Sequence, residues 1–244
     1  MKRVNNHYIS RKKRLLREFD ETAVIAKDLI VSRYDKDFAN ELRKETRKAY
    51  EELIPQIPYI KGFPTLRRFF ANKTLIVCAQ ELAVYKILKR HGRTAEEAWE
   101  LCHDVLRSRL KRAPVFTRWM IRYLTFSKLM RTIEAKIQRK SSGDFLARVL
   151  EGDGEKFDFG VDYIECPIYK FMCEQGAGEF APYICLSDIL LSDAFGWGLM
   201  RTGTLAEGCD RCDFRFKKGG KTRISSRIPE IQAMLERLCK KTDL

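Results

Sequence analysis

Cysteine residues are concentrated in one stretch of this chain, and their thiols are the first candidates for chemistry. Five of the eight cysteines lie within 52 residues at Cys166, Cys173, Cys185, Cys209 and Cys212. A thiolate requires a nearby positive charge or a helix N-terminus to lower the pKa of the thiol. We therefore expect the chemistry of the chain between Glu165 and Phe216, although the default interpretation of any single cysteine is a small buried residue.

Two of these cysteines stand close to predicted helix starts. Cys166 directly precedes Pro167, a residue typical of a first helical turn, so its thiol would lie near the positive end of that helix. Cys185 precedes Asp188 by three residues in a helix predicted over residues 182–195, which would place the thiol and the carboxylate on one helix face. These side chains are candidates for acid, base or nucleophile.

A carboxylate is a better candidate for the general base than a histidine. The three histidines, His7, His91 and His103, all belong to the N-terminal half of the chain. Asp188 is therefore the candidate base. Arg201 is flanked by small and hydroxyl residues and is either a bidentate partner for a substrate carboxylate or an exposed charge on a strand.

Cys209 and Cys212 have the C-x-x-C spacing of zinc ligands. The chain has no second C-x-x-C pair and no histidine in this half. Because Cys212 alternates with Phe214 and Phe216, it also fits a buried strand position. We therefore expect no metal and no cofactor, and Cys209 and Cys212 are the candidate ligands if zinc binds.

Positive charge is concentrated in two segments of the chain, whose net charge is +14. Residues 1–17 carry seven Lys or Arg and no acid, and residues 107–140 carry eleven against the single Glu134. Apolar residues recur at helical spacing through the second segment, which predicts a helix with a buried apolar face and solvated basic residues. No nucleic-acid-binding motif accompanies the charge, so nucleic acid is not expected as a partner, whereas weak contact with a membrane surface stays open.

The composition, 45% hydrophobic and 33% charged residues, is typical of a globular protein. No segment is apolar for the roughly 20 residues of a membrane span, and no secretory signal is evident. We therefore expect a cytoplasmic protein whose cysteines are reduced thiols. A homo-oligomer is left open.

The spacing of apolar residues predicts helices first and strands later. Helices are expected over residues 36–54, 72–90, 94–110 and 114–139, with a break at 141–143 and a short helix at 145–150. Thr94 followed by Glu97 predicts a capping box at the start of the third of these helices. The period then changes to two, which predicts strands over 157–163, 199–206 and 212–217, with helices at 167–175, 182–195 and 229–240. This order is typical of one α+β domain: a basic extension or helix (1–35), a helical part (36–150) and a part with a small antiparallel sheet and interleaved helices (151–244).

Three short motifs occur in order in the C-terminal part: EFAPYICLSD at Glu179–Asp188, RTGTLAEG at Arg201–Gly208 and CDFRF at Cys212–Phe216. Together they resemble the L-2-amino-thiazoline-4-carboxylic acid hydrolase family, with which the helical half is also compatible. The resemblance implies a hydrolase that adds water to the amidine carbon of a small cyclic carboxylate. The ring would open to an N-carbamoyl-cysteine type of product.

The resemblance also implies roles for the motif residues. Asp188 would activate the water, and Cys185 or Cys166 would donate a proton or act as a transient nucleophile. Arg201 would hold the substrate carboxylate. The remaining substrate-binding candidates are Thr204, Cys212 and Asp213.

The C-terminal third is also similar to small-molecule-binding domains related to bacteriochlorophyll 4-vinyl reductase. This second resemblance rests on the glycine that precedes Cys212, Asp213 and Phe214. It implies a non-catalytic ligand-binding domain in which cysteines can hold zinc. Both interpretations are open from the sequence.

Overall fold

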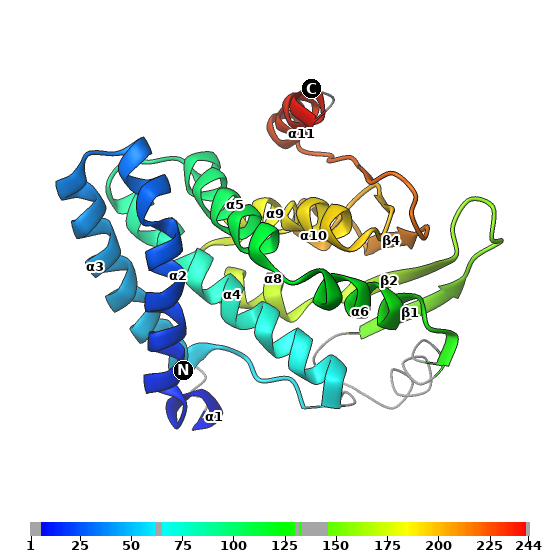
Figure 1. The fold of residues 1–244 in the computed structure, drawn as a ribbon, viewed down its shortest axis with the longest axis horizontal. Coiled ribbons are helices and arrows are strands. Elements are labelled where there is room, and N and C mark those ends of the chain that lie inside the picture. Colours follow the sequence, from blue (N-terminus) through cyan, green and yellow to red (C-terminus); the bar gives the residue numbers. More distant parts are fainter. Residues whose placement is uncertain (1–5, 62–64, 130–131, 133–145, 243–244) are drawn as a thin grey trace. The chain divides into compact units, whose positions relative to one another are not determined.

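The computed structural model describes residues 6–61, 65–129, 132 and 146–242 (Figure 1). Contacts divide the chain into two compact units. Unit 1 comprises residues 1–61, 65–112 and 170–180, and unit 2 comprises residues 62–64, 113–169 and 181–244. Unit 1 is helical and unit 2 holds a five-stranded sheet, so the predicted α+β class is confirmed.

Unit 1 is built from helices whose starts the sequence defines locally. They are α1 (Asn6–Ile9), α2 (Lys12–Arg33), α3 (Lys36–Leu53), α4 (Thr65–Arg90) and α5 (Ala95–Arg112), with the short 3-10 helices η1 (Ile54–Gln56) and η2 (Gly178–Phe180). Before α5, the Glu97 N–H donates to the Thr94 hydroxyl at 3.1 Å and the Thr94 N–H donates to the Glu97 carboxylate at 2.8 Å. The predicted capping box is confirmed.

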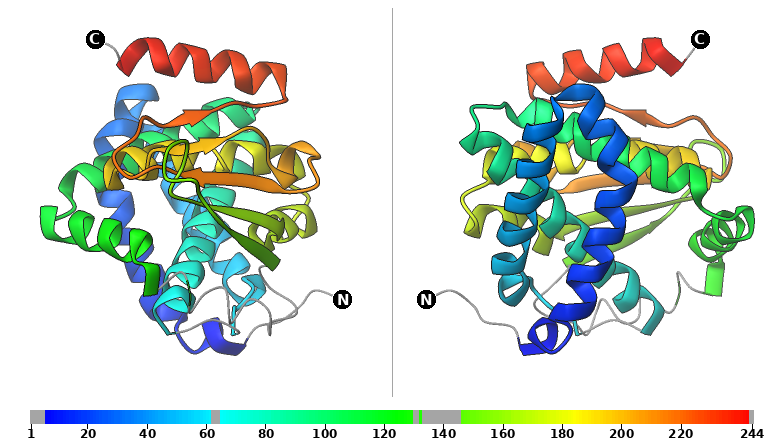
Figure 2. Two further views of the ribbon diagram at one scale, coloured as in Figure 1. Left: turned by 90° about the vertical axis from the view of Figure 1, so that its right-hand side faces the viewer. Right: turned by 60° about the vertical axis from the view of Figure 1, so that its left-hand side comes forward.

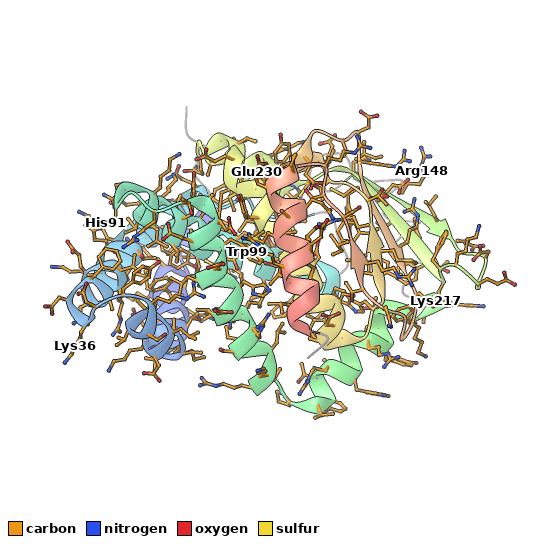
Figure 3. All side chains as sticks on the ribbon, turned by 90° about the horizontal axis from the view of Figure 1, so that it is seen from above. Lys36, His91, Trp99, Arg148, Lys217 and Glu230 are labelled. Carbon is orange, nitrogen blue, oxygen red and sulfur yellow. The ribbon has the colours of Figure 1, made fainter. Side chains whose placement is uncertain are left out.

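A buried amide ties the segment after η1 to α4. The Asn72 side chain accepts the Ile60 N–H at 2.9 Å and donates to the Ile60 carbonyl at 3.0 Å. The Tyr8 hydroxyl also donates to Asn72 at 2.9 Å. These bonds satisfy polar groups that would be costly to bury alone. Elsewhere in unit 1, the Trp99 side chain is buried and the Lys36 side chain projects outward (Figure 3).

The sheet of unit 2 is mixed, and most of its neighbouring strands are antiparallel. Its strands are β1 (Leu146–Glu151), β2 (Phe159–Glu165), β3 (Leu199–Arg201), β4 (Cys212–Phe216) and β5 (Arg223–Ile224). They lie in the order β1-β2-β4-β3-β5, and β3 and β5 are parallel. One face is apolar and buried, because alternate residues such as Phe159, Leu199 and Phe216 point to the same side.

In the described residues of unit 2, the helices include α6 (Val115–Phe126), α9 (Ala181–Ile184), α10 (Ser187–Phe195), α11 (Pro229–Thr242) and the 3-10 helix η3 (Leu205–Glu207). The helix α8 (Pro167–Glu174) begins in unit 2 and ends in unit 1. Beyond the β5 edge of the sheet lies α11, as both views of Figure 2 show. No helix in the described residues combines the length and the apolar character needed to cross a membrane.

Two predicted helices are wrong in extent or type. The segment expected as a short helix at 145–150 forms β1, because its backbone pairs with β2 along the whole strand. The helix beginning after Pro114 ends at Phe126, where Ser127 turns to an extended conformation. The expected end at Arg139 and the break at 141–143 lie outside the described residues.

The predicted apolar face of α6 is only partly buried. Met120 and Leu124 are half-buried, but Trp119 stacks between Phe116 and Tyr123 with 59% of its own surface accessible. Arg122 instead packs against the backbone at Gly196 and Gly219, where an added Cβ would lie 3.2–3.3 Å from its guanidinium. Two glycines without side chains leave room for an arginine, so the basic residue lies inward.

Gly198 and Gly208 form a matched pair for testing the turns beside β3. Both have positive φ angles, but an added Cβ at Gly198 would lie 2.2 Å from the Lys217 carbonyl oxygen, whereas one at Gly208 meets nothing within 4 Å. We expect Gly208→Ala to lower the free energy of unfolding by about 1 kcal/mol through backbone strain. Gly198→Ala should lower it at least twice as much, as measured by urea unfolding. Equal losses would show that the close contact is relieved without cost.

Candidate functional site

Arg201 is a buried cation on the apolar face of the sheet. It is the last residue of β3, and alternation along the strand places it on the same face as Leu199. Only 2% of its surface is exposed. Its guanidinium carbon lies 5.5 Å from the centroid of the Phe214 ring on the neighbouring strand β4. A charge in such a place requires a partner.

The partners of Arg201 come from the chain that connects α9 to α10. Its Nη1 donates to Asp188 Oδ2 at 2.5 Å and to the Cys185 carbonyl oxygen at 3.0 Å. Burial raises the pKa of Asp188, and the Arg201 charge opposes that shift. The buried Nε of Arg201 has no hydrogen-bond partner among the described residues. The Arg201 guanidinium therefore links β3 to the Asp188 carboxylate and to the backbone of Cys185, a candidate catalytic residue.

Cys185 reaches this position from a turn. The single helix predicted over 182–195 is wrong, because α9 ends at Ile184 and α10 begins at Ser187. In the turn, the Leu186 N–H donates to the Tyr183 carbonyl at 3.0 Å. Cys185 and Asp188 therefore do not lie on one face of a single helix. Their common contact with Arg201 brings them together.

Three thiols lie close enough to influence one another. Burial is the main cause that raises the pKa of Cys185 well above its ordinary value, and the charges of Cys166 and Cys212 raise it further. Burial also raises the pKa of Cys212 to about 12, although its sulphur accepts the Leu205 N–H at 3.2 Å. The thiols of Cys185 and Cys212 are therefore protonated at neutral pH.

Asp213 points away from this cluster. It follows Cys212 in β4, so its side chain lies on the other face of the sheet. Its carboxylate accepts the N–H groups of Thr202 and Gly203 at 2.9 and 3.0 Å and the Thr202 hydroxyl at 2.5 Å. Asp213 therefore holds the backbone at the start of the connection between β3 and β4.

Thr204 is held inside that connection and is 1% exposed. Its N–H and hydroxyl donate to the Glu207 carboxylate at 2.9 and 3.1 Å. Glu207 also accepts a hydrogen bond from the Ser226 hydroxyl. Glu207 was not among the predicted site residues, although the Thr-x-x-Glu spacing from Thr204 matches the capping-box pattern seen at Thr94 and Glu97.

A second buried acid on the far face of the sheet was also missed. Asp162 in β2 is 5% exposed, and its carboxylate lies 2.8 Å from Arg215 and 3.4 Å from Arg211. Because β2 and β4 pair with Asp162 opposite Asp213, acids and arginines share that face. The sequence signal for this buried acid was Asp162 itself, which lies between the apolar residues of the strand.

Cys209 and Cys212, the candidate ligands if zinc binds, have no further ligand group around them in the described residues. In the described ranges, the side chains that form a group of at least three with metal-ligand geometry are Glu41, Glu45 and His91, which belong to unit 1. Cys209 and Cys212 are not part of such a group. Cys209 packs its sulphur against Gly203, where an added Cβ would lie 2.5 Å from it.

The converging residues lie in the part of the chain that a family model matches. The model of the L-2-amino-thiazoline-4-carboxylic acid hydrolase family matches residues 70–216, which is more than half of the chain. The chain belongs to this family. No curated protein and no solved structure matches the chain. The part that matches the hydrolase family runs from within α4 to the end of β4 and contains every candidate site residue named above.

The ion pair between Asp188 and Arg201 should stabilise unit 2. Asp188→Asn leaves a buried guanidinium without its counter-charge, and we expect a loss of about 3 kcal/mol in the free energy of unfolding. The matched control is Asp193→Asn in the same helix, because Asp193 is exposed and bonds the Thr222 hydroxyl. In urea unfolding, the double variant Asp188→Asn with Arg201→Met should lose less than the sum of the single variants. Additive losses would contradict the pairing.

Proposed function

We propose that this protein is a hydrolase that opens a cyclic amidine ring in a small carboxylate such as 2-amino-thiazoline-4-carboxylate. One observation carries the proposal: Asp188 and the Cys185 backbone share Arg201 as their partner, next to two more thiols, within motifs of the hydrolase family. An acid, a base and a fixed charge are the groups that such a hydrolysis requires.

The proposed reaction hydrolyses the bond between the amidine carbon and the ring sulphur. The water oxygen bonds to the amidine carbon, and the bond from that carbon to the ring sulphur breaks. One proton of the water goes to the sulphur and the other to the ring nitrogen, which gives an N-carbamoyl-cysteine. The protein must therefore take a proton from water and return a proton to the leaving sulphur.

We assign the first of these steps to Asp188. Its carboxylate is three-quarters buried, and the raised pKa makes it a stronger base than an exposed aspartate. The hydrogen bond from Arg201 Nη1 fixes one carboxylate oxygen, which leaves the other to accept the proton of water. In this assignment Arg201 is a positioning residue. Its binding to a substrate carboxylate remains a further prediction, for which Nε is a donor without a partner in the described residues.

The thiol of Cys185 is assigned as the proton donor to the leaving sulphur. A nucleophilic thiolate would require a cation that lowers its pKa, but Arg201 is engaged by Asp188 and burial raises the pKa of Cys185. Cys166 is half-buried nearby and is the second candidate donor. We assign Cys212 to the wall of the site, and Thr204 and Asp213 to holding the connection after β3.

We also propose that the protein acts in the cytoplasm. No disulfide joins two of the seven cysteines in the described residues. Reduced thiols are the usual state in a reducing compartment. A hydrolysis that depends on the Cys185 thiol as an acid would be lost if that thiol formed a disulfide.

The substrate assignment is tested with the purified full-length chain and 2-amino-thiazoline-4-carboxylate. We expect free thiol to be released in proportion to enzyme and time, as measured with a chromogenic thiol reagent. Asp188→Asn should lower the rate by at least about a hundredfold, because general base catalysis is lost. Asp193→Asn should stay near the wild-type rate. No thiol release by the wild-type chain at high enzyme concentration would end the substrate claim.

The role of the thiol is tested separately with Cys185→Ser. Because a hydroxyl is a weaker acid than a thiol, we expect a loss of about tenfold to a hundredfold in kcat with little change in KM. The control is Cys173→Ser, since Cys173 is exposed and belongs to another unit. Wild-type kcat in a stably folded Cys185→Ser chain would remove Cys185 from the mechanism.

A further inference from the structure

Glu81 is an acidic residue at a core position of α4. It shares a helix face with Val77 and Val84, which are four residues before it and three after it. The residue is 8% exposed and makes no hydrogen bond or ion pair with any described residue. Buried carboxyl groups in proteins are normally paired, so this one indicates a missing partner.

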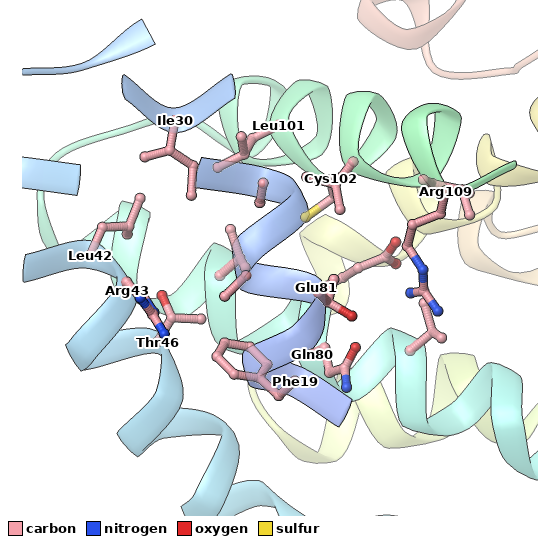
Figure 4. Close-up of a pocket in the computed structure, with 17 residues that line it drawn as sticks. Phe19, Ile30, Leu42, Arg43, Thr46, Gln80, Glu81, Leu101, Cys102 and Arg109 are labelled. Carbon is pink, nitrogen blue, oxygen red and sulfur yellow. The ribbon is translucent and has the colours of Figure 1, made fainter. Parts of the chain in front are cut away.

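A cavity of about 90 Å³ in unit 1 lies at this side chain (Figure 4). Helices α2, α3, α4 and α5 form its walls, which are mainly apolar, with Phe19, Ile30, Leu42 and Leu101 among them. The hydroxyl of Thr46, a second polar group in the lining, is also buried without a partner in the described residues. The cavity is roomy enough for more than a single water molecule.

The charged side chains of the lining favour an anion. Arg43 and Arg109 are exposed, and Glu81 is the one acid in the lining. Burial raises the pKa of Glu81 to about 7, and the Arg109 charge limits that rise. The other titratable lining group is Cys102, whose thiol stays neutral because burial raises its pKa well above the ordinary value. With Glu81 protonated, the lining carries two positive charges and no negative charge.

We propose that this pocket binds a small molecule with a short hydrocarbon body and one carboxylate group. The body packs against the apolar walls, and the carboxylate lies between Arg109 and the protonated carboxyl of Glu81. The Glu81 O–H and an Arg109 N–H then both donate to the ligand. This pocket belongs to unit 1, whereas the residues of the proposed hydrolytic site belong to unit 2.

The proposal predicts a direction for the pH dependence of binding. Ionised Glu81 repels a carboxylate, so the bound state requires a proton on Glu81. Affinity should therefore fall as the pH rises through the region of its pKa. Between pH 6 and pH 8 the protonated fraction of a group with a pKa of about 7 decreases by about tenfold, and the affinity should decrease by the same factor.

Pentanoate is a suitable probe, with pentan-1-ol and pentylamine as probes of matched length. We expect titration calorimetry on the full-length chain to show that pentanoate binds most tightly at pH 6 and about tenfold more weakly at pH 8. In Glu81→Gln, which keeps a hydrogen-bond donor, affinity should change less than about twofold over that range. Glu52→Gln, an exposed change in α3, should keep the wild-type pH dependence.

Three results would overturn the proposal. Tighter binding of pentylamine than of pentanoate would assign the pocket to cations. An unchanged pH dependence in Glu81→Gln would remove Glu81 from the site. No binding by any of the three probes at millimolar concentration would mean that the cavity holds water alone. None of these results bears on thiol release from the thiazoline substrate, so this inference and the proposed function fail separately.

Discussion

The burial of Arg201 is the constraint on which the candidate site depends. A guanidinium on the apolar face of a sheet is tolerated only if nearby groups neutralise its charge and accept its hydrogen bonds. Asp188 and the Cys185 carbonyl supply both, and they do so from a turn between two short helices. Because Arg201 requires these partners, the turn packs against the sheet. Two motifs that are separated in the sequence meet for this reason.

The two faces of the sheet in unit 2 have different roles. On the apolar face, Arg201 and Cys212 belong to the cluster of thiols and acid. On the other face, Asp213 and Asp162 bind backbone groups and arginines, which fixes the connection after β3 and the pairing of β2 with β4. Neighbouring residues of the CDFRF motif therefore serve different purposes, because successive side chains of a strand point to opposite faces.

Each unit contains a buried carboxyl group with a raised pKa, but the surroundings differ. In unit 2 the charge of Arg201 lies against Asp188 and opposes the effect of burial. In unit 1 the charge of Arg109 lowers the pKa of Glu81 but forms no ion pair with it in the described part of the chain, and burial raises that pKa to about 7. Proximity of a cation decides whether a buried acid is a fixed partner or a group that readily takes up a proton.

Features that depend on residues close together in the chain could be predicted from the amino-acid sequence. The capping box of Thr94 and Glu97, the alternation of β2 and β4, and the family motifs at Asp188, Arg201 and Cys212 were readable because each depends on local spacing. Tertiary contacts decide that residues 146–151 form a strand, that α9 and α10 are separate helices, and that Phe116, Trp119 and Tyr123 of α6 are exposed. They also decide that Glu81 is buried without a partner. The reason is physical: strand pairing, the counter-charge for a buried arginine and the space around a helix are supplied by residues far away in the chain, and local spacing carries no information about them.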